Sequence, residues 1–272
     1  MKKILTIAGS DSSGGAGIQA DIKTITMHGM YAMTAITAIT AQNTKGVSAV
    51  WETPKELLRE QIRCVIEDIR PDGIKIGMVA GKEQIRVIAE ELRRSGVEQV
   101  VVDTVMVSTS GRRLLEAGAE TALCKELLPL ARLVTPNIPE AQALTGIQIH
   151  SPRQMEQAAQ AIHERIGAAV LIKGGHLDGE AADLLFDEGR MIWFSHPRVE
   201  NRNTHGTGCT LSSAIACRLA LGESMEESVR KAKAYLTGAI SAKLDLGAGR
   251  GPLNHMWAYE EEELLRKVCR KE

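Results

Sequence analysis

Short runs of β-branched and aliphatic residues alternate with longer amphipathic stretches along most of the chain. Runs such as Val100-Val101-Val102 are continuously apolar, as expected of a parallel sheet covered by helices on both faces. The alternation predicts an α/β fold with three layers, in which a doubly wound, mostly parallel sheet lies between helices. The predicted strands are residues 4–8, 34–41, 74–78, 99–105, 133–135 and 169–173. The predicted helices are residues 18–28, 54–68, 82–95, 118–128 and 152–166.

Two features interrupt this alternation in the last third of the chain. Residues 184–186 and 191–194 flank a Gly-containing turn, which predicts a β-hairpin and hence an antiparallel edge to the sheet. Two consecutive helices are predicted after it, at residues 210–221 and 225–244. Because no Pro- or Ser-rich linker, low-complexity segment or repeat divides the sequence, we predict one domain over residues 1–272.

Composition excludes several classes of protein for this chain of 272 residues. Basic and acidic side chains nearly balance, 33 against 34, which disfavours an electrostatically bound nucleic acid. Aromatic residues make up only 3%, so base-stacking platforms are disfavoured as well and the core must be aliphatic. The three tryptophans, Trp51, Trp193 and Trp257, are expected to pack against the protein and not to stack on a ligand.

Cysteine usage and the apolar runs bear on the compartment. The five cysteines are scattered and include no Cys-x-x-Cys pair, which disfavours a disulfide framework and a structural zinc site. The first apolar run is shorter than that of a signal peptide, and no run approaches the roughly 18 apolar residues of a membrane helix. We therefore predict a cytoplasmic protein that binds neither membrane nor nucleic acid.

The carboxyl ends of the predicted strands are the places to look for a ligand site. Residues 9–17, after the first strand, contain four glycines in nine residues, which permit positive φ and close approach of the backbone to a ligand. The next helix would direct its free N–H groups at this loop, as anion sites require. The loop has neither a Gly-x-Gly-x-x-Gly nor a Walker pattern, so taken alone it is equally compatible with a flexible connection.

A second glycine turn, Gly206-Thr207-Gly208, opens a helix of small and apolar residues. Its backbone N–H groups would converge on one point, which suits a phosphate or a transferring phosphoryl group. Cys209 falls in the first turn of that helix, where the helix dipole favours a thiolate that acts as base or nucleophile. Taken alone, Cys209 is more often interpreted as a buried and inert residue, since free Cys is among the most buried residue types.

Functional groups follow three further predicted strands. Asp103 follows residues 100–102, Asn137 and Glu140 follow residues 133–136, and Lys173 follows residues 169–172. A carboxylate so placed can hold Mg²⁺ and a lysine can neutralise phosphate, although each residue alone is also compatible with a helix cap or a salt bridge. The predicted topology would bring all of them to one edge of the sheet.

Seven blocks carry more information together than singly: AGSDSSGGAGIQAD at residues 8–21, TAQNT at 40–44, KIGM at 75–78, DTVM at 103–106, TPNIPEA at 135–141, IKGGH at 172–176 and NTHGTGCT at 203–210. In this order they resemble the bacterial hydroxymethylpyrimidine/phosphomethylpyrimidine kinases of thiamine biosynthesis, in the ribokinase-like superfamily. The resemblance covers nearly the whole chain. It implies ATP- and Mg²⁺-dependent phosphorylation of 4-amino-5-hydroxymethyl-2-methylpyrimidine and then of its monophosphate to the diphosphate.

Three sets of site residues follow from the resemblance, position by position. The catalytic set is Cys209, as the base, with Gly206, Thr207 and Gly208 as the anion hole. The phosphate set is Lys173, Asn137 and Thr207 for ATP, with Asp103 and Glu140 for the metal. The substrate set is Gln42, Met78, Val105, Gly9 and Asp21. A thiol pKa lowered toward neutrality would suit the base.

Two alternatives remain open at this point, and the resemblance adds an expectation of a homodimer. Gln42 stands where some relatives have Glu, and kinases with a similar Cys-containing loop accept pyridoxal or pyridoxine. Vitamin B6 phosphorylation, alone or as a second activity, is therefore one alternative. A non-catalytic sensor domain that binds the pyrimidine or a nucleotide is the other, against which the intact Lys173, Glu140, Asp103 and Cys209 argue.

Overall fold

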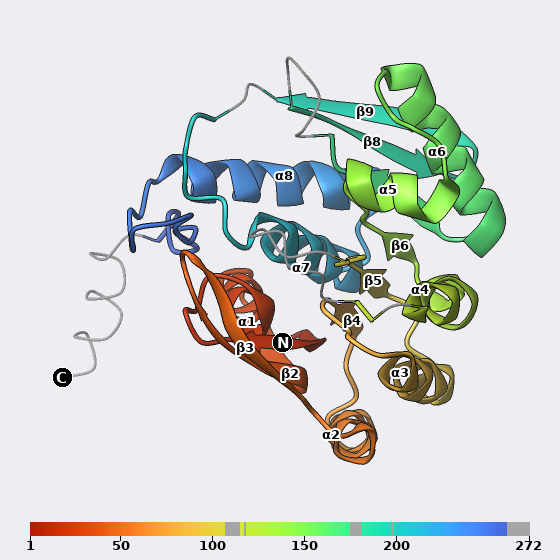
Figure 1. Cartoon of the computed structure of the whole chain (residues 1–272), viewed down its shortest axis with the longest axis vertical. Coiled ribbons are helices and arrows are strands. Elements are labelled where there is room, and N and C mark those ends of the chain that lie inside the picture. The colour runs from red at the N-terminus through yellow and green to blue at the C-terminus, as the bar shows by residue number, and fades with distance from the viewer. Residues whose placement is uncertain (107–114, 117, 175–180, 197–198, 260–272) are drawn as a thin grey trace.

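The computed structural model describes residues 1–106, 115–116, 118–174, 181–196 and 199–259. Its centre is a nine-stranded sheet with the order β3-β2-β1-β4-β5-β6-β7-β8-β9 (Figure 1). The parallel strands are β1 (Lys3–Asp11), β2 (Tyr31–Asn43), β4 (Gly73–Ile76), β5 (Val100–Val102), β6 (Leu133–Val134) and β7 (Ala169–Ile172). Antiparallel strands close both edges: β3 (Gly46–Glu52) beside β2, and β8 (Ala181–Asp187) with β9 (Arg190–His196) beside β7.

Helices cover both faces of the sheet (Figure 1). One layer contains α1 (Gly17–Met27), α7 (Thr207–Ala220) and α8 (Met225–Ser241). The other contains α2 (Lys55–Asp68), α3 (Lys82–Ser95), α4 (Ala119–Ala122), α5 (Ile138–Thr145) and α6 (Pro152–Ile166). The predicted three-layer α/β/α fold, with its mostly parallel sheet and antiparallel edge hairpin, is therefore confirmed.

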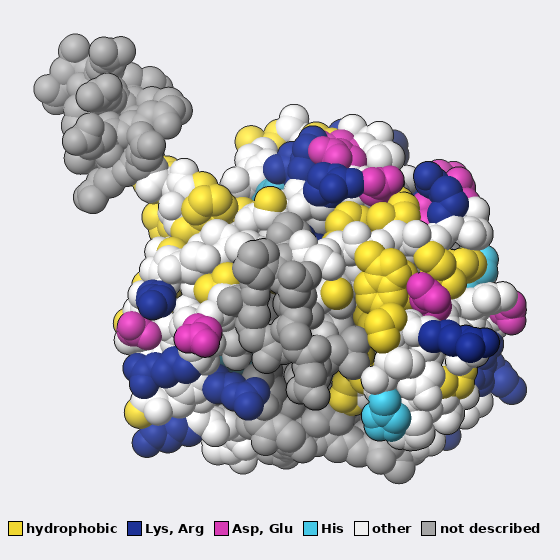
Figure 2. Space-filling view, turned by 90° about the horizontal axis from the view of Figure 1, so that it is seen from above, with side chains coloured by type: hydrophobic (Ala, Val, Ile, Leu, Met, Phe, Trp, Pro, Cys, Tyr) yellow, Lys and Arg dark blue, Asp and Glu magenta, His cyan; other side chains and the backbone are white. Residues whose placement is uncertain are grey.

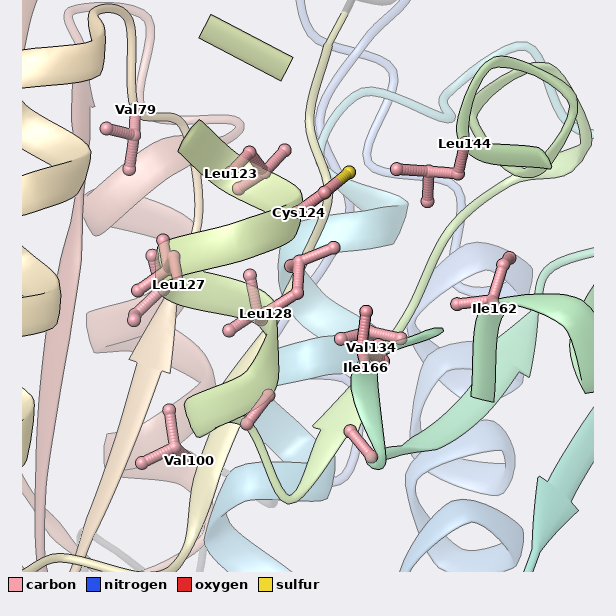
Figure 3. Packing of buried hydrophobic residues seen from close by; sticks show 14 of the residues in the cluster. Val79, Val100, Leu123, Cys124, Leu127, Leu128, Val134, Leu144, Ile162 and Ile166 are labelled. Atoms are coloured by element: carbon pink, nitrogen blue, oxygen red, sulfur yellow. The ribbon is translucent and has the colours of Figure 1, made fainter. Parts of the chain in front are cut away.

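The core between these layers is built mainly from aliphatic side chains, as the low aromatic content predicts. Leu127, Leu128 and Val134 belong to the larger apolar cluster, which lies between the sheet and the layer of α2 to α6 (Figure 3). A second cluster joins the other face of the sheet to α7 and α8 through residues such as Leu171 and Ile215. Burying one such side chain contributes about 1.5–3 kcal/mol, so the sheet is a firm platform for groups at its edge.

Some elements differ from the sequence prediction. β3 was not predicted, because its side chains alternate poorly and remain exposed or half-buried. Trp51 on this strand is 76% exposed, so the expectation that it packs is wrong, while Trp193 does lie against the core. The predicted helix at 118–128 is instead α4 followed by a π turn and a 3₁₀ turn that contains Pro129. α5 was missed because its eight residues are too short to show a clear amphipathic pattern.

The order of the strands fixes where a ligand can bind. β1 pairs with β2 on one side and with β4 on the other, so the chain reverses direction across the sheet between β1 and β4. Ligands of doubly wound sheets bind beyond the carboxyl ends of the strands at such a point. On the face shown in Figure 2, acidic and basic side chains are interspersed, in line with the net charge of −1.

Candidate active site

The ends of β5, β6 and β7 bring polar side chains together at the carboxyl edge of the sheet. Lys173 follows β7, and its Nζ donates a 2.7 Å hydrogen bond to Oδ1 of Asp103, which follows β5. Thr135, after β6, donates its hydroxyl to the same oxygen at 3.0 Å. Gly208 faces both groups, since a Cβ there would lie 3.1 Å from Asp103 Oδ2 and 3.4 Å from Lys173 Nζ. The fold therefore produces the predicted convergence of Asp103, Lys173 and the glycine turn.

The turn Gly206-Thr207-Gly208 leads directly into α7. Gly206 has φ +86°, and a Cβ there would collide with the carbonyl oxygen of Gly15, so only glycine fits. The glycine loop after β1 consequently lies against this turn. The first N–H groups of α7 have no partner within the helix and meet the edge that carries Asp103 and Lys173. An anion bound there would be held by backbone amides with a cation beside it.

Cys209 lies in the first turn of α7 and is half-buried. Burial raises the pKa of its thiol to about 11; the Lys75 ammonium opposes this rise, whereas the carboxylates of Asp21 and Asp103 add to it. A hydrogen bond from the Gly17 amide lowers the pKa only in part. Desolvation thus outweighs the helix N-terminus, and the expectation of a thiol pKa near neutrality is wrong.

Lys173, Asp103 and Glu140 influence one another electrostatically. Burial alone would lower the pKa of Lys173, but the carboxylates of Asp103 and Glu140 outweigh it and raise that pKa. Burial raises the pKa of Glu140, with Lys173 opposing the rise and Asp103 adding to it. Lys173 thus pairs directly with Asp103 and interacts with Glu140 over a longer distance, and an added divalent cation would balance the excess negative charge.

Asn137 and Glu140 form a capping box at the start of α5. Asn137 Oδ1 accepts a 2.9 Å bond from the Glu140 amide, and Glu140 Oε2 accepts one of 2.9 Å from the Asn137 amide. Glu140 Oε1 has a contact of 3.5 Å with the Met106 amide, so this oxygen keeps accepting capacity. Among the residues described, no group of three or more His, Cys, Asp or Glu side chains could hold a metal ion. Mg²⁺ commonly needs only one or two protein carboxylates in addition to phosphate oxygens, and Asp103 and Glu140 could supply these carboxylates.

The other half of the site lies at the ends of β1 and β2. His205 Nε2 is 2.7 Å from Oδ2 of Asp11 and 3.1 Å from Nε2 of Gln42. Asp11 also accepts hydrogen bonds of 2.8–3.2 Å from three amides of the glycine loop, so its carboxylate fixes that loop. Burial opposes the ionisation of Asp11, but hydrogen bonds from His205 and Ser13 lower its pKa to about 2. One carboxylate thus ties together the glycine loop and the segment that precedes α7.

Gln42 is half-buried at the end of β2 and is held through both its backbone and its side chain. Its backbone N–H donates to Ser12 Oγ, and its carbonyl accepts from the same hydroxyl, each at 2.9 Å. Thr40 donates its hydroxyl to the side-chain oxygen at 3.2 Å. The amide beside His205 is therefore oriented before any ligand binds.

Three other predicted substrate residues lie at neighbouring strand ends. A Cβ on Gly9 would lie 3.1 Å from Sδ of Met78, so Gly9, near the end of β1, and Met78, after β4, are in contact. Val105, after β5, is half-buried, as is Met78. Such apolar groups beside an amide suit a small heteroaromatic ring.

Asp21 is the predicted substrate residue that the structure does not bring to this surface. It is fully buried in α1, and its two oxygens accept four hydrogen bonds: two from Lys75 and one each from Thr6 and Ser213. A carboxylate offers about four acceptor sites, so all are used within the protein. Sequence reasoning thus missed Lys75, and it also missed Asp11 and His205, whose contact spans 194 positions without any local signal.

Fold and site together define a small-molecule kinase of the ribokinase-like class. Residues 11–254 match the family described as Phosphomethylpyrimidine kinase, and the chain belongs to this family. It is 52% identical over 255 residues to the hydroxymethylpyrimidine/phosphomethylpyrimidine kinase of Rhizobium meliloti, covering 92% of this chain and 96% of that protein. Membership of a kinase family implies ATP as the phosphoryl donor.

Solved structures give the same likeness. The phosphomethylpyrimidine kinase from Clostridium difficile 630 is 49% identical with a TM-score of 0.80, covering 88% of this chain and all of that one. The pyridoxal kinase from Staphylococcus aureus in complex with ADP is 36% identical with a TM-score of 0.89, covering 96% of each chain. The chain also spans about half, 53%, of a thiamine biosynthesis bifunctional protein from Geobacter sulfurreducens. Of the helices described, none combines the length and apolarity that crossing a bilayer requires.

Proposed function

We propose that this chain transfers phosphate from ATP to the hydroxymethyl group of 4-amino-5-hydroxymethyl-2-methylpyrimidine, and then to the resulting monophosphate. The observation that carries the proposal is the meeting of Lys173, Asp103 and the turn before Cys209 at one sheet edge, in a chain of this kinase family. Phosphoryl transfer needs positioning and charge neutralisation more than covalent chemistry from the protein. A cation, a carboxylate and free backbone amides supply both.

In the first transfer, the substrate hydroxyl gives its proton to the thiolate of Cys209. Its oxygen forms a bond to the γ-phosphorus as the bond from that phosphorus to the bridging oxygen breaks, and ADP leaves. The amides of the turn at Gly206 to Cys209 stabilise the charge on the transferring group, and Lys173 offsets the charge of the triphosphate. Because only the ionised thiol accepts a proton, a pKa of about 11 makes the reactive form a minor one in the free protein at neutral pH.

The second transfer needs no base. The acceptor is then a phosphate monoester, whose second pKa is about 6, so its oxygens are already largely deprotonated at neutral pH. Cys209 therefore serves the first transfer, whereas Lys173 and the glycine turn serve both. This difference separates the role of the thiol from that of the phosphate-binding groups.

Asp103 and Glu140 are the residues that would hold Mg²⁺ in this proposal. Asp103 is paired with the ammonium of Lys173, and Glu140 adds a second carboxyl group, which suits the pair to a divalent cation. When bound, the ion would supply positive charge to the phosphate oxygens. Asn137 and Thr207 complete the proposed contacts to ATP, in addition to capping α5 and opening α7.

Gln42 is proposed to form hydrogen bonds with the polar edge of the pyrimidine. Its amide can donate to a ring nitrogen and accept from the exocyclic amino group, which matches an aminopyrimidine. Gly9, Met78 and Val105 would provide the apolar contacts to the ring. The hydrogen bond from the Thr40 hydroxyl to the side-chain oxygen of Gln42 supports this role, because it orients the amide in advance.

The direct test measures ADP release with the pyrimidine alcohol, its monophosphate and pyridoxal as separate substrates. We expect turnover of both pyrimidines. Absence of turnover with any of the three, in a folded protein that still binds ATP, would contradict the enzyme proposal and favour the sensor alternative.

Pyridoxal phosphorylation is the second candidate. The likeness to the Staphylococcus aureus pyridoxal kinase favours it, since that structure covers 96% of this chain at a TM-score of 0.89. Pyridoxal also carries a hydroxymethyl group on a heteroaromatic ring. The same assay decides between the candidates through the ratio of kcat/KM for pyridoxal and the pyrimidine alcohol.

We further propose a cytoplasmic homodimer with one kinase domain per chain. The single nine-stranded sheet supports one domain, and free thiols at all four described cysteines support a reducing compartment. Ile39 and Trp51, cross-strand partners on β2 and β3, are 55% and 76% exposed and support an apolar interface at this edge. Light scattering of the protein and of Trp51→Asp tests it, a monomeric wild-type protein being the contrary result.

A further inference from the structure

A buried ion pair lies beneath the reacting edge and has no part in the steps above. Lys75 of β4 and Asp21 of α1 are both fully buried, and Lys75 Nζ donates to the two Asp21 oxygens at 2.9 and 2.8 Å. Thr6 and Ser213 donate their hydroxyls to the same carboxylate at 2.5 and 2.7 Å. A buried ion pair is a weak source of stability, because desolvating both charges offsets most of their attraction. Stability alone therefore does not explain it.

The pair lies about one helical turn below Cys209. Cys209 and Ser213 are four residues apart on α7, and Gly17 and Asp21 are four apart on α1, so each couple lies on one face of its helix. The two helices pack together, and the Ser213 hydroxyl of α7 bonds to Asp21 of α1. Successive levels on such a face are about 6 Å apart. The ion pair therefore lies within about one helical turn of the thiol, close enough for its charges to act on the ionisation of Cys209.

The ammonium of Lys75 is directed toward the site. Its Nζ lies 2.8 Å from where a Cβ on Gly77 would be, so the side chain runs toward the carboxyl end of β4. An ammonium has three N–H groups, which allows Lys75 to bind Asp21 and still present charge toward the thiol. Asp21 keeps the ammonium charged in the interior: burial would lower the pKa of Lys75, but the adjacent carboxylate raises it.

Four charged groups surround Cys209 from the elements packed against it. They are Lys75 on β4, Asp21 on α1, Asp103 after β5 and Lys173 after β7. After the opposing effect of burial, the ammonium of Lys75 is the largest influence on the pKa of the thiol and the main one that favours the thiolate.

We propose that Lys75 is a positioning residue for the first transfer, whose fixed charge, held by Asp21, stabilises the Cys209 thiolate that takes the substrate proton. This inference rests on the proposed role of Cys209 as base. The substrate O–H bond breaks as the S–H bond forms, and the thiol later returns its proton to solvent. Transfer to the phosphate acceptor involves no such step, so it should be nearly independent of Lys75.

The test removes both charges together, so that neither is left unpaired, in the variant Lys75→Met/Asp21→Asn. Alkylation of Cys209 by iodoacetamide at pH 8–9 is expected to slow about threefold, because the loss of Lys75, which favours the thiolate, outweighs the simultaneous loss of Asp21, which opposes it, by about half a pKa unit. Fragmentation of the modified peptide separates Cys209 from the buried Cys217. Transfer to the alcohol should fall about threefold as well, whereas transfer to the monophosphate should stay nearly constant.

Two further variants test whether the effect depends on the charges of the buried pair: a matched control at an exposed ion pair, and a second neutral replacement of Lys75 and Asp21. Lys55→Met/Glu83→Gln removes an exposed pair with an N–O distance of 3.2 Å and should change neither measurement. Lys75→Gln/Asp21→Asn retains a polar contact in the interior and should slow alkylation as the Met variant does.

The outcomes separate the inference from the proposed function. Unchanged alkylation of Cys209 in a folded neutral pair overturns the inference, and so does an equal loss with both acceptors. A direct role of Asp21 in binding substrate would instead raise the acceptor KM. Should the wild-type protein phosphorylate no pyrimidine, the proposed function fails, while the alkylation rates still decide whether Lys75 stabilises the thiolate.

Discussion

The two halves of the site are assembled in different ways. In the phosphate half, Asp103 and Lys173 each follow a parallel strand, and the sheet alone brings them to a distance of 2.7 Å. In the pyrimidine half, Gln42 contacts His205 across 163 positions, and His205 contacts Asp11 across 194. Backbone topology thus assembles the groups for transfer, whereas long-range side-chain contacts assemble those for selection. Substitutions in the first half should therefore lower kcat, and substitutions in the second should raise the acceptor KM.

The largest expected effect is that of Cys209→Ala in the phosphate half. Loss of a general base costs about 10²–10⁴ in rate, so kcat with the pyrimidine alcohol should fall about 10³-fold while the KM for ATP stays nearly constant. With the monophosphate as acceptor the loss should stay below about tenfold, because that acceptor is already ionised. Steady-state ADP release with each acceptor measures both.

Cys64→Ala is the matched control, since it removes an exposed cysteine on α2. Comparable alcohol kinase activity in Cys209→Ala would remove the thiol from the base role. Equal losses with the two acceptors would mean that the substitution disturbs the anion site. The loss of activity would then not be evidence that Cys209 acts as the base.

The pH dependence sharpens the same distinction. Below a thiol pKa of about 11 the thiolate fraction rises tenfold per pH unit, so kcat/KM for the alcohol should rise about a hundredfold between pH 7 and pH 9. The profile for the monophosphate should be nearly flat over this range, since its second pKa is about 6. A flat profile for the alcohol as well would show that proton transfer does not limit the reaction or that another group accepts the proton.

Sequence reasoning succeeded where local pattern and topology suffice. α3 and α6 have the predicted bounds, because each is amphipathic and ends at a glycine with positive φ, Gly96 and Gly167. The phosphate half was predictable for the same reason, since every parallel strand delivers the residue after it to one edge. Asn137 and Glu140 illustrate the limit: the motif was recognised, but the structure shows them capping a helix that the pattern did not reveal.

Sequence reasoning failed where a role depends on burial or on distant partners. The first turn of α7 suggested a lowered thiol pKa for Cys209, yet desolvation raises it, and burial cannot be read from a helix position. Asp21 was assigned to the substrate, although its four hydrogen bonds are all internal. His205 belongs to the NTHGTGCT block that supports the family resemblance, but no local spacing indicates its contacts with Asp11 and Gln42.

In the pyrimidine half, Gln42→Ala should raise the KM for both pyrimidine acceptors about tenfold. The substitution leaves the polar edge of the ring without a partner in a half-buried site, which costs about 1.4 kcal/mol. kcat and the KM for ATP should change little. Gln160→Ala, an exposed glutamine on α6, is the control of the same residue type. A selective rise in the KM for ATP would place Gln42 in the phosphate half instead.

The smallest expected effect is the coupling between Gln42 and His205, which tests whether the pyrimidine half acts as a unit. His205→Gln removes the ring that bridges Asp11 and Gln42, so the acceptor KM should rise several-fold. If the histidine acts by orienting the amide, the double variant with Gln42→Ala should be about threefold less impaired than the product of the single effects, as residues in contact typically couple. Measured KM values for wild type, both single variants and the double variant complete the cycle. Strict additivity would mean that His205 and Gln42 contribute to substrate selection independently.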